Sequence, residues 1–374
     1  MRKTVALVTS GLGTAYGGIG VVAESISKAL APCKVLIWQH PPFWPRVARI
    51  SKLGVQMSLG ALHPPDLLIY DHVHLAVLHG TIPYLRRIPY VVMLHGVEVW
   101  EPLTGRRREA LLGANLLIAN SATTVAAART ANPWLPRVEV TWLGVRGHAD
   151  PVDPGKSPPV GLIVGRMASS ERYKGHDVVM NAWPLIRAAV PDAKLLIVGK
   201  GGDEPRLRRR VIQEQLEAVE FLGHLSDGER DRTYRSVRLL FYPSNQEGFG
   251  LAGLEALAFG VPFLGLAGSV VEELFPRHEG VVVARDLTGR SIAEAAIPLF
   301  QRPELASKLG SAGHARVQSS FLEKHFIARL RRALAPVLPS VGLEDVSDES
   351  RQLAATTLGD HHVPPPASEA SDPR

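Results

Sequence analysis

Two glutamates, Glu247 and Glu255, lie eight positions apart in the stretch PSNQEGFGLAGLEALAFG, and the tripeptide Gly-Phe-Gly directly follows the first of them. Carboxylate oxygens accept hydrogen bonds from hydroxyl groups. Gly248 and Gly250 carry no side chain, so the backbone between the two carboxylates can approach an anion closely. The pattern fits a site for hydroxyls and a phosphate, although glutamates on the solvated face of a helix would show the same spacing.

The elements around these glutamates indicate which backbone groups face a ligand. The run LLFYPS predicts a strand, and Phe249 to Phe259 is predicted as a helix that ends at Gly260 and Pro262. The amides of Gly250 and Leu251 then lie at the helix N-terminus, where they have no intrahelical acceptor. Because this end carries about half a positive charge, it favours a bound phosphate.

A second glycine-rich turn, within GLGTAYGGIGVVAESISKAL, follows the first predicted strand. Gly17 and Gly18 precede an amphipathic helix, so we expect their amides to form the second half of an anion site that faces a cleft. The turn is not the G-x-G-x-x-G fingerprint of dinucleotide-binding proteins. The alternative is a tight loop without a ligand.

The whole chain alternates short apolar runs with helix-length segments, which indicates parallel sheets built from βαβ units. The strand candidates are TVALVTS, KVLIWQ, DLLIYD, YVVMLHG, LLIANS and VEVTWLGV, then VGLIVGRM, AKLLIVGKG, VEFLGHL, LLFYPS, VPFLGL and GVVVARD. We therefore expect an α/β protein with two Rossmann-like domains in tandem. The expected boundaries are residues 1–145 and 159–335 for the domains, 146–158 for a linker and 336–374 for an acidic, disordered tail. Ligands of such sheets bind at the carboxyl ends of the strands, so the active site is expected in the interdomain cleft.

The length and the charge of the chain limit the classes of protein to which it can belong. At 374 residues the chain exceeds the usual size of a single core. Its formal net charge is +6, and because the tail holds seven acidic and two basic residues, the remaining chain is near +11. Such a charge favours an anionic partner, but no basic segment with interleaved aromatics indicates nucleic acid. The single cysteine, Cys33, excludes an internal disulfide and a cysteine metal cluster, and it fits a reducing cytoplasm.

The sequence contains no uninterrupted apolar run of about 18 residues, so we expect no membrane-spanning helix. The N-terminal segment MRKTVALVTSG lacks the apolar run and the cleavage site of a signal peptide, which favours a cytoplasmic location.

The segment PPFWPRVARISKLG, residues 41–54, suggests contact with a membrane surface. A helix over residues 45–53 would place three basic side chains in one stripe, with an apolar stripe beside it and two aromatics at its start. The basic residues are Arg46, Arg49 and Lys52, the apolar ones are Val47, Ile50 and Leu53, and the aromatics are Phe43 and Trp44. This arrangement suits peripheral binding to anionic lipid, whereas the alternative is a surface helix whose apolar stripe packs on the sheet.

The segment PSNQEGFGLAGLEALAFGVPF resembles the signature of the retaining glycosyltransferases of family 4, which are group 1 glycosyltransferases with the GT-B fold. The resemblance extends from about residue 5 to about residue 332. It implies that Glu247 contacts hydroxyls of the donor sugar and that Glu255 binds the ribose of the sugar nucleotide.

The same resemblance implies how the diphosphate is held. The amides around Phe249, Gly250 and Leu251 would bind it, and Arg166 and Lys174, in VGRMASSERYKGHD, would stabilise it as it leaves. A departing diphosphate gains negative charge, and the chain has no D-x-D pair to hold a metal that would neutralise it. We therefore expect no metal and no other cofactor. The segment is about two residues longer than the commoner family pattern, with the surplus at residues 169–172.

In the first half of the chain, the resemblance implies that Gly17 and Gly18 lie close to the donor phosphate and the acceptor. His95, in LHGVEVW, matches a histidine that hydrogen-bonds the donor sugar, and a core or capping histidine is the alternative. Three further residues have no assigned role: Glu98, Asn120 and Ser121.

The implied reaction is transfer of a hexose from a nucleoside-diphosphate sugar, of the GDP-mannose or UDP-glucose type, to an acceptor hydroxyl with retention at the anomeric carbon. The acceptor would be a sugar or a lipid-linked sugar, in cell-envelope polysaccharide or glycolipid synthesis, with the enzyme in the cytoplasm or on the inner face of the cytoplasmic membrane. Two alternatives stay open: a sugar-nucleotide 2-epimerase of the same fold, and a non-catalytic protein that binds a nucleotide sugar.

Overall fold

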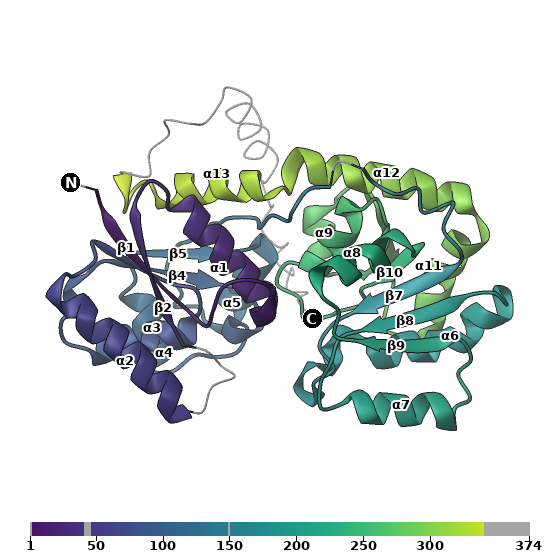
Figure 1. Ribbon diagram of the computed structural model, residues 1–374, viewed down its shortest axis with the longest axis horizontal. Coiled ribbons are helices and arrows are strands. Elements are labelled where there is room, and N and C mark those ends of the chain that lie inside the picture. Colours follow the sequence, from purple (N-terminus) through teal and green to yellow (C-terminus); the bar gives the residue numbers. More distant parts are fainter. Residues whose placement is uncertain (1, 41–45, 149, 340–374) are drawn as a thin grey trace, which may run out of the picture.

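The computed structural model describes residues 2–40, 46–148 and 150–339, and two parallel sheets lie side by side along the length of the molecule (Figure 1). The first sheet has the strand order β2-β1-β3-β4-β5-β6 and the second the order β12-β11-β10-β7-β8-β9. The strands of the first are β1 (Thr4–Thr9), β2 (Lys34–Gln39), β3 (Leu67–Tyr70), β4 (Tyr90–Leu94), β5 (Leu116–Ala119) and β6 (Val138–Val140). Those of the second are β7 (Val160–Val164), β8 (Lys194–Val198), β9 (Val219–Gly223), β10 (Leu239–Phe241), β11 (Phe263–Leu266) and β12 (Val281–Ala284).

Helices follow most strands, as βαβ units require. Those in the first half are α1 (Gly17–Ala29), α2 (Arg46–Leu62), α3 (Val73–Thr81), α4 (Gly105–Leu112) and α5 (Ala122–Ala131). The later ones are α6 (His176–Ala189), α7 (Glu204–Gln213), α8 (Asp227–Arg235), α9 (Leu251–Ala258), α10 (Val270–Leu274), α11 (Gly289–Gln301), α12 (Pro303–Ser320) and α13 (Glu323–Leu334). Short 3-10 helices are η1 (Thr14–Tyr16), η2 (Leu85–Arg87), η3 (Val97–Val99) and η4 (Ser169–Lys174).

The strands form where the sequence has continuous apolar runs, because a parallel sheet covered by helices on both faces buries every residue. All residues of β3 and β4 are buried, and so are the second to sixth residues of β1. All the predicted strands are present, although β6 is shorter than the run VEVTWLGV. The predicted α/β class with two Rossmann-like domains is confirmed.

The chain passes between the domains at Val145 and again at Leu322, where the two segments run side by side. The Val145 amide donates to the Phe321 carbonyl at 2.8 Å, and the Glu323 amide donates to the Val145 carbonyl at 2.9 Å. After this second passage α13 packs on α1 of the first domain, and Figure 1 shows it there, in yellow. The range 159–335 therefore ends with a helix that belongs spatially to the first domain.

Helix α2 contains most of the segment, residues 41–54, that the sequence predicted to contact a membrane. Phe43 and Trp44 lie outside the described residues, as do the side chains of residues 46–51. The Lys52 ammonium donates to Gln39 Oε1 at 2.8 Å, and the Leu53 side chain is buried, so this part of the apolar stripe packs inward. The exposed face instead carries three apolar residues that the prediction did not use: Val55, Leu59 and Leu62. No helix in the described part of the chain is both long and apolar enough to cross a membrane.

Candidate active site

The carboxyl ends of the strands bring the first predicted pair together. Lys174, at the end of η4, places its Nζ 3.8 Å from Oε2 of Glu247, which follows β10. Both side chains are about one-fifth exposed, at 22% and 21%. Glu247 Oε2 is buried and has no hydrogen-bond partner among the described residues. The pair therefore combines a cation with a carboxylate oxygen that can still accept a hydrogen bond from a ligand hydroxyl.

Tyr242 lies beneath this pair and was not predicted from the sequence. Burial, together with the Glu247 carboxylate, raises the pKa of the Tyr242 phenol well above its usual range. The hydroxyl therefore keeps its proton and can donate to Glu247. A buried tyrosine in a strand run gives no sequence signal for this role, since burial alone explains such a residue.

Glu255 lies on α9 with partners of its own. The Tyr234 hydroxyl donates to its Oε2 at 3.3 Å, and Arg230 Nε lies 3.8 Å from the same oxygen. Burial raises the pKa of Glu255, and the charge of Arg230 opposes that change. The two glutamates of the motif thus occupy separate polar environments, as one carboxylate for each sugar of a donor would require.

The N-terminus of α9 differs from the prediction in one detail. The helix begins at Leu251 rather than at Phe249, because Gly250 has a φ of 97°, a left-handed conformation that glycine adopts easily. The Phe249 ring is buried and packs edge-on against Phe321 with ring centroids 6.2 Å apart. Phe249 can therefore face a ligand only through its backbone, whereas the first amides of α9 lack intrahelical acceptors.

The segment η4 explains the surplus residues after β7. The backbone of Glu171 is kinked, and its carboxylate pairs with Arg166 Nη2 at 2.7 Å. Arg166 itself is 76% exposed. Arg172 points to Asp203 instead, with contacts of 3.0 and 2.9 Å, so Lys174 is the cation that faces Glu247.

Asp203 belongs to a separate network of charges. Hydrogen bonds from Arg206, and then from Arg172, hold the pKa of Asp203 well below its usual range. Arg206 also pairs with Asp177 at 2.7 Å. These ion pairs join η4, α6 and α7. They thus hold in place the turn that carries Arg166 and Lys174.

His95 follows β4 of the first domain and is held by three groups. Its Nε2 lies 2.6 Å from the Asp71 backbone carbonyl, and since a carbonyl only accepts, Nε2 carries the proton. Its amide donates to Glu98 Oε1 at 2.5 Å, and its carbonyl accepts from Asn120 Nδ2 at 2.7 Å. In the neutral ring Nδ1 is then the nitrogen left to accept a hydrogen bond from a sugar hydroxyl. Glu98 and Asn120, which had no assigned role, position His95 through its backbone.

The two domains meet at Gly248. Its carbonyl accepts from Ser121 Oγ at 2.8 Å, and a Cβ added at Gly248 would lie only 1.7 Å from the His95 carbonyl oxygen. The loop that carries Glu247 therefore packs directly against the loop that carries His95. A glycine is required here because any side chain would separate the domains.

The glycine-rich turn after β1 also approaches the second domain, at Gly18. Gly17 and Gly18 are the first two residues of α1 and do not precede it, so the predicted helix start was wrong by two residues. A Cβ at Gly18 would lie 3.2 Å from Leu251 Cδ1, whereas one at Gly17 would meet nothing within 4 Å. The first turns of α1 and α9 thus lie close together.

Glu273, on α10, joins the domains and was also not predicted. Its carboxylate accepts from the amides of Ala122 and Thr123, from Thr123 Oγ1 and from Trp142 Nε1, at 2.7–2.9 Å. These donors lie more than a hundred positions earlier in the chain, so no local pattern could indicate them. No cluster of three or more His, Cys, Asp or Glu side chains within the described ranges could hold a metal ion.

Comparison with known proteins shows which family the second half of the chain resembles. The family model described as "Glycosyl transferases group 1" matches residues 151–316. Residues 151–316 are thus similar to the group 1 glycosyl transferases. They contain Arg166, Lys174, Glu247 and Glu255, that is, every predicted site residue with a charged side chain.

The curated relatives include a mannosyltransferase and a glycogen synthase. A GDP-mannose-dependent monoacylated alpha-(1-6)-phosphatidylinositol monomannoside mannosyltransferase of Corynebacterium glutamicum is 34% identical over 156 residues, 40% of this chain and 40% of that protein. A glycogen synthase of Mycobacterium tuberculosis is 27% identical over 297 residues, 73% of this chain and 68% of that protein. The chain thus spans less than half of the first relative's length and about two thirds of the second's.

Solved structures establish the fold. Sucrose-phosphate synthase from Thermosynechococcus elongatus has a TM-score of 0.71 at 18% identity, over 91% of this chain and 100% of that one. HepE from Anabaena, in complex with UDP and glucose, has a TM-score of 0.69 at 17% identity, over 90% of this chain and 100% of that one. The chain therefore has the GT-B fold, as the sequence predicted.

Proposed function

We propose that the protein transfers a hexose from a nucleoside-diphosphate sugar to an acceptor hydroxyl with retention at the anomeric carbon. One observation carries the proposal: Lys174 pairs with a Glu247 oxygen that has no hydrogen-bond partner among the described residues, this pair lies beside the N-terminus of α9, and Gly248 packs against His95. Groups suited to a diphosphate and to sugar hydroxyls are thereby gathered where the domains meet.

The proposed role of the second domain is to stabilise the leaving group. As the bond between the anomeric carbon and the phosphate oxygen breaks, the diphosphate gains negative charge. Lys174, Arg166 and the first amides of α9 would compensate it. Glu247 and Glu255 would hold hydroxyls of the two sugars of the donor.

The proposed role of the first domain is to align the reactants. His95, with Nδ1 as acceptor, would bind a hydroxyl of the donor sugar. The acceptor oxygen would form its bond to the anomeric carbon on the face from which the diphosphate leaves, and its proton would pass to the departing phosphate oxygen. Most of the rate enhancement would then come from positioning and electrostatics.

Two donor types are supported. The name of the Corynebacterium relative specifies GDP-mannose, and HepE was solved in complex with UDP and glucose. An acceptor in glycolipid or polysaccharide synthesis is supported by the same relative, whose name contains a phosphatidylinositol mannoside, and by the glycogen synthase. The relatives do not favour the epimerase alternative.

The test is to incubate the purified protein separately with GDP-mannose and UDP-glucose and to follow nucleotide release by chromatography. We expect slow hydrolysis of one donor, and an α-linked product by NMR once an acceptor is supplied. Release should continue in excess EDTA if two cations replace a metal. Tight binding of both donors without turnover would support the non-catalytic alternative, and conversion of the sugar without nucleotide release would support an epimerase.

A further inference from the structure

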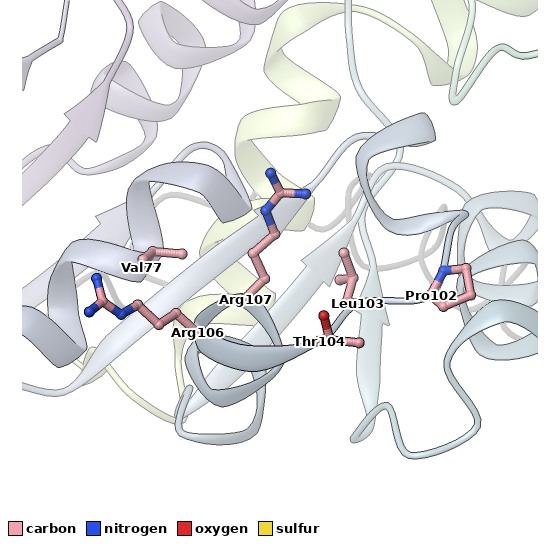
Figure 2. A pocket seen from close by; sticks show the side chains of 6 residues that line it. All are labelled: Val77, Pro102, Leu103, Thr104, Arg106 and Arg107. Carbon is pink, nitrogen blue, oxygen red and sulfur yellow. The ribbon is translucent and has the colours of Figure 1, made fainter.

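A second polar site lies on the first domain, away from the residues assigned to the donor. Val77 of α3, the segment Pro102–Thr104, and Arg106 and Arg107 of α4 line a pocket of about 320 Å³ (Figure 2). Pockets that hold small ligands have volumes of about 300–1,000 Å³. The pocket is therefore large enough for a sugar-sized or phosphate-bearing group.

The chemistry of this pocket selects an anion. Arg106 and Arg107 are exposed, and neither has an ion pair or hydrogen bond in the described part of the chain. The Thr104 side chain makes no capping hydrogen bond, and the first turn of α4 has no acidic residue. Two guanidinium groups, which point in different directions in Figure 2, and the helix start of α4 thus line the pocket beside the buried Leu103.

Three histidine rings connect the pocket with the candidate active site. His74 lies one helical turn before Val77, on the same face of α3. Its ring stacks on that of His72 with centroids 4.7 Å apart, and the His72 ring lies 6.5 Å from that of His95. The three rings thus lie in sequence from His74, on the pocket side, to His95, on the donor side.

The two histidines nearest the pocket, His72 and His74, favour the neutral form at neutral pH. Burial lowers the pKa of His72 to about 4 and also lowers that of His74, to which the charge of Arg107 contributes. His72 Nδ1 accepts from the His74 amide at 3.2 Å, so the proton of the neutral His72 ring is on Nε2. A neutral imidazole of this kind can donate a hydrogen bond to a sugar hydroxyl.

We propose that the pocket of Arg106 and Arg107 binds a phosphate group of the acceptor, while the acceptor's hydroxyl-bearing part lies over His74 and His72 and reaches the donor at His95. This inference rests on the proposed function, because it assigns an acceptor class to the same enzyme. The phosphate could belong to a soluble sugar phosphate or to a lipid headgroup.

Binding measured directly tests the inference without requiring turnover. The full chain, with UDP and GDP both saturating so that the donor site is filled, is titrated calorimetrically with glycerol 3-phosphate. In a second arm it is sedimented with vesicles that contain phosphatidylinositol. We expect one of these probes to bind, and we expect the double variant R106A/R107A to weaken that binding by about tenfold or more, since charge-assisted hydrogen bonds to phosphate are lost.

The neighbouring arginine supplies the matched control. Arg108 is also exposed on α4, but its guanidinium lies over the Trp134 ring, 5.1 Å from the centroid, so R108A should bind the probe as the wild type does. Binding of glycerol 3-phosphate that depends on Arg106 and Arg107 indicates a soluble acceptor, and the same dependence with vesicles alone indicates a headgroup. If neither probe binds, or if R106A/R107A binds as tightly as R108A, the inference is wrong. Failure of the proposed function would instead appear as absent donor turnover in the wild type.

Discussion

Lys174 brings one positive charge to within 3.8 Å of the Glu247 carboxylate, at a point where both side chains are about four-fifths buried. We expect Lys174→Ala to lower the rate of donor hydrolysis by about a hundredfold, because a charge that stabilises the departing diphosphate is lost in a partly desolvated site. The measurement is nucleotide release at saturating donor.

Lys156→Ala is the matched control for this change, since Lys156 is 86% exposed and its ammonium lies 3.8 Å from Asp153. Arg166→Ala should act in the same direction as Lys174→Ala, with a smaller loss, because Arg166 is 76% exposed and pairs with Glu171. Wild-type turnover in the Lys174 variant would contradict the assigned role.

Asp71 provides a prediction about stability and pH. Its side chain is fully buried, and burial raises the pKa of its carboxyl from 3.8 to about 6. The folded state thus holds this proton more tightly than the unfolded state, so stability is lost as pH rises from about 4 to 6. Asp71→Asn removes the charge and should stabilise the fold at pH 7 by about 3 kcal/mol or less, the equivalent of two pKa units.

Urea denaturation of wild type and Asp71→Asn at several pH values measures this difference. The gain should shrink towards zero near pH 4, where the wild-type carboxyl is protonated in the folded protein. Asp192→Asn, at an exposed position, should show no such trend. A constant gain across the pH range would mean that packing rather than charge explains the effect.

The residues that the sequence predicted share a feature: each lies in the loop or in the first helix after a strand, so the local pattern places it near the carboxyl edge of a sheet. The arrangement around Lys174 and Glu247 follows from two such motifs. Tyr242 and Asp71 could not be predicted in the same way, because a buried tyrosine and a single aspartate acquire their roles only through the groups packed against them.

At the scale of elements, apolar runs predicted the strands well, because burial on both faces leaves few other sequences possible. Helix starts were less predictable. The left-handed backbone at Gly250 delays α9 to Leu251, whereas α1 already includes Gly17 and Gly18. In both cases glycine permits either outcome, so only the packing of the two first turns against each other decides the start.

The prediction about membrane binding concerns helix α2. Its exposed face presents Val55, Leu59 and Leu62, with exposed fractions of 59%, 62% and 73%, spaced as one stripe of a helix. The predicted basic residues Arg46 and Arg49 precede them on the same helix. Together with a chain of net charge +6, the stripe suits peripheral binding to anionic lipid.

Co-sedimentation with anionic liposomes at low and high salt measures this binding. We expect the wild type to pellet at low salt, and the triple change of Val55, Leu59 and Leu62 to Ser to leave most of the protein in the supernatant. Ile212→Ser, on α7 of the second domain and 75% exposed at Ile212, is the control for loss of an exposed apolar side chain. Equal pelleting of the triple variant would exclude α2 as the contact.

At the scale of the whole molecule, the predicted groups act together only when the domains are in contact. Gly248 packs on His95, and the Gly248 carbonyl accepts from Ser121. These contacts join residues more than a hundred positions apart, so the sequence could indicate a shared site but not the groups that hold its two halves together.

Glu273 is one of the groups that hold the two domains together. It caps the start of α5 through the amides of Ala122 and Thr123 and also accepts from Trp142, so one carboxylate of the second domain satisfies several donors of the first. We expect Glu273→Ala to reduce kcat for donor hydrolysis about tenfold, because contact between the domains becomes less favourable while the donor-binding groups of the second domain are unchanged. In small-angle scattering with saturating donor, the Glu273→Ala variant should have a larger radius of gyration than the wild type.

Glu272→Ala, at the adjacent exposed position, is the control and should match the wild type in both measurements. A Glu273 variant with normal scattering and reduced kcat would show that Glu273 acts on the site itself and not on the contact between the domains.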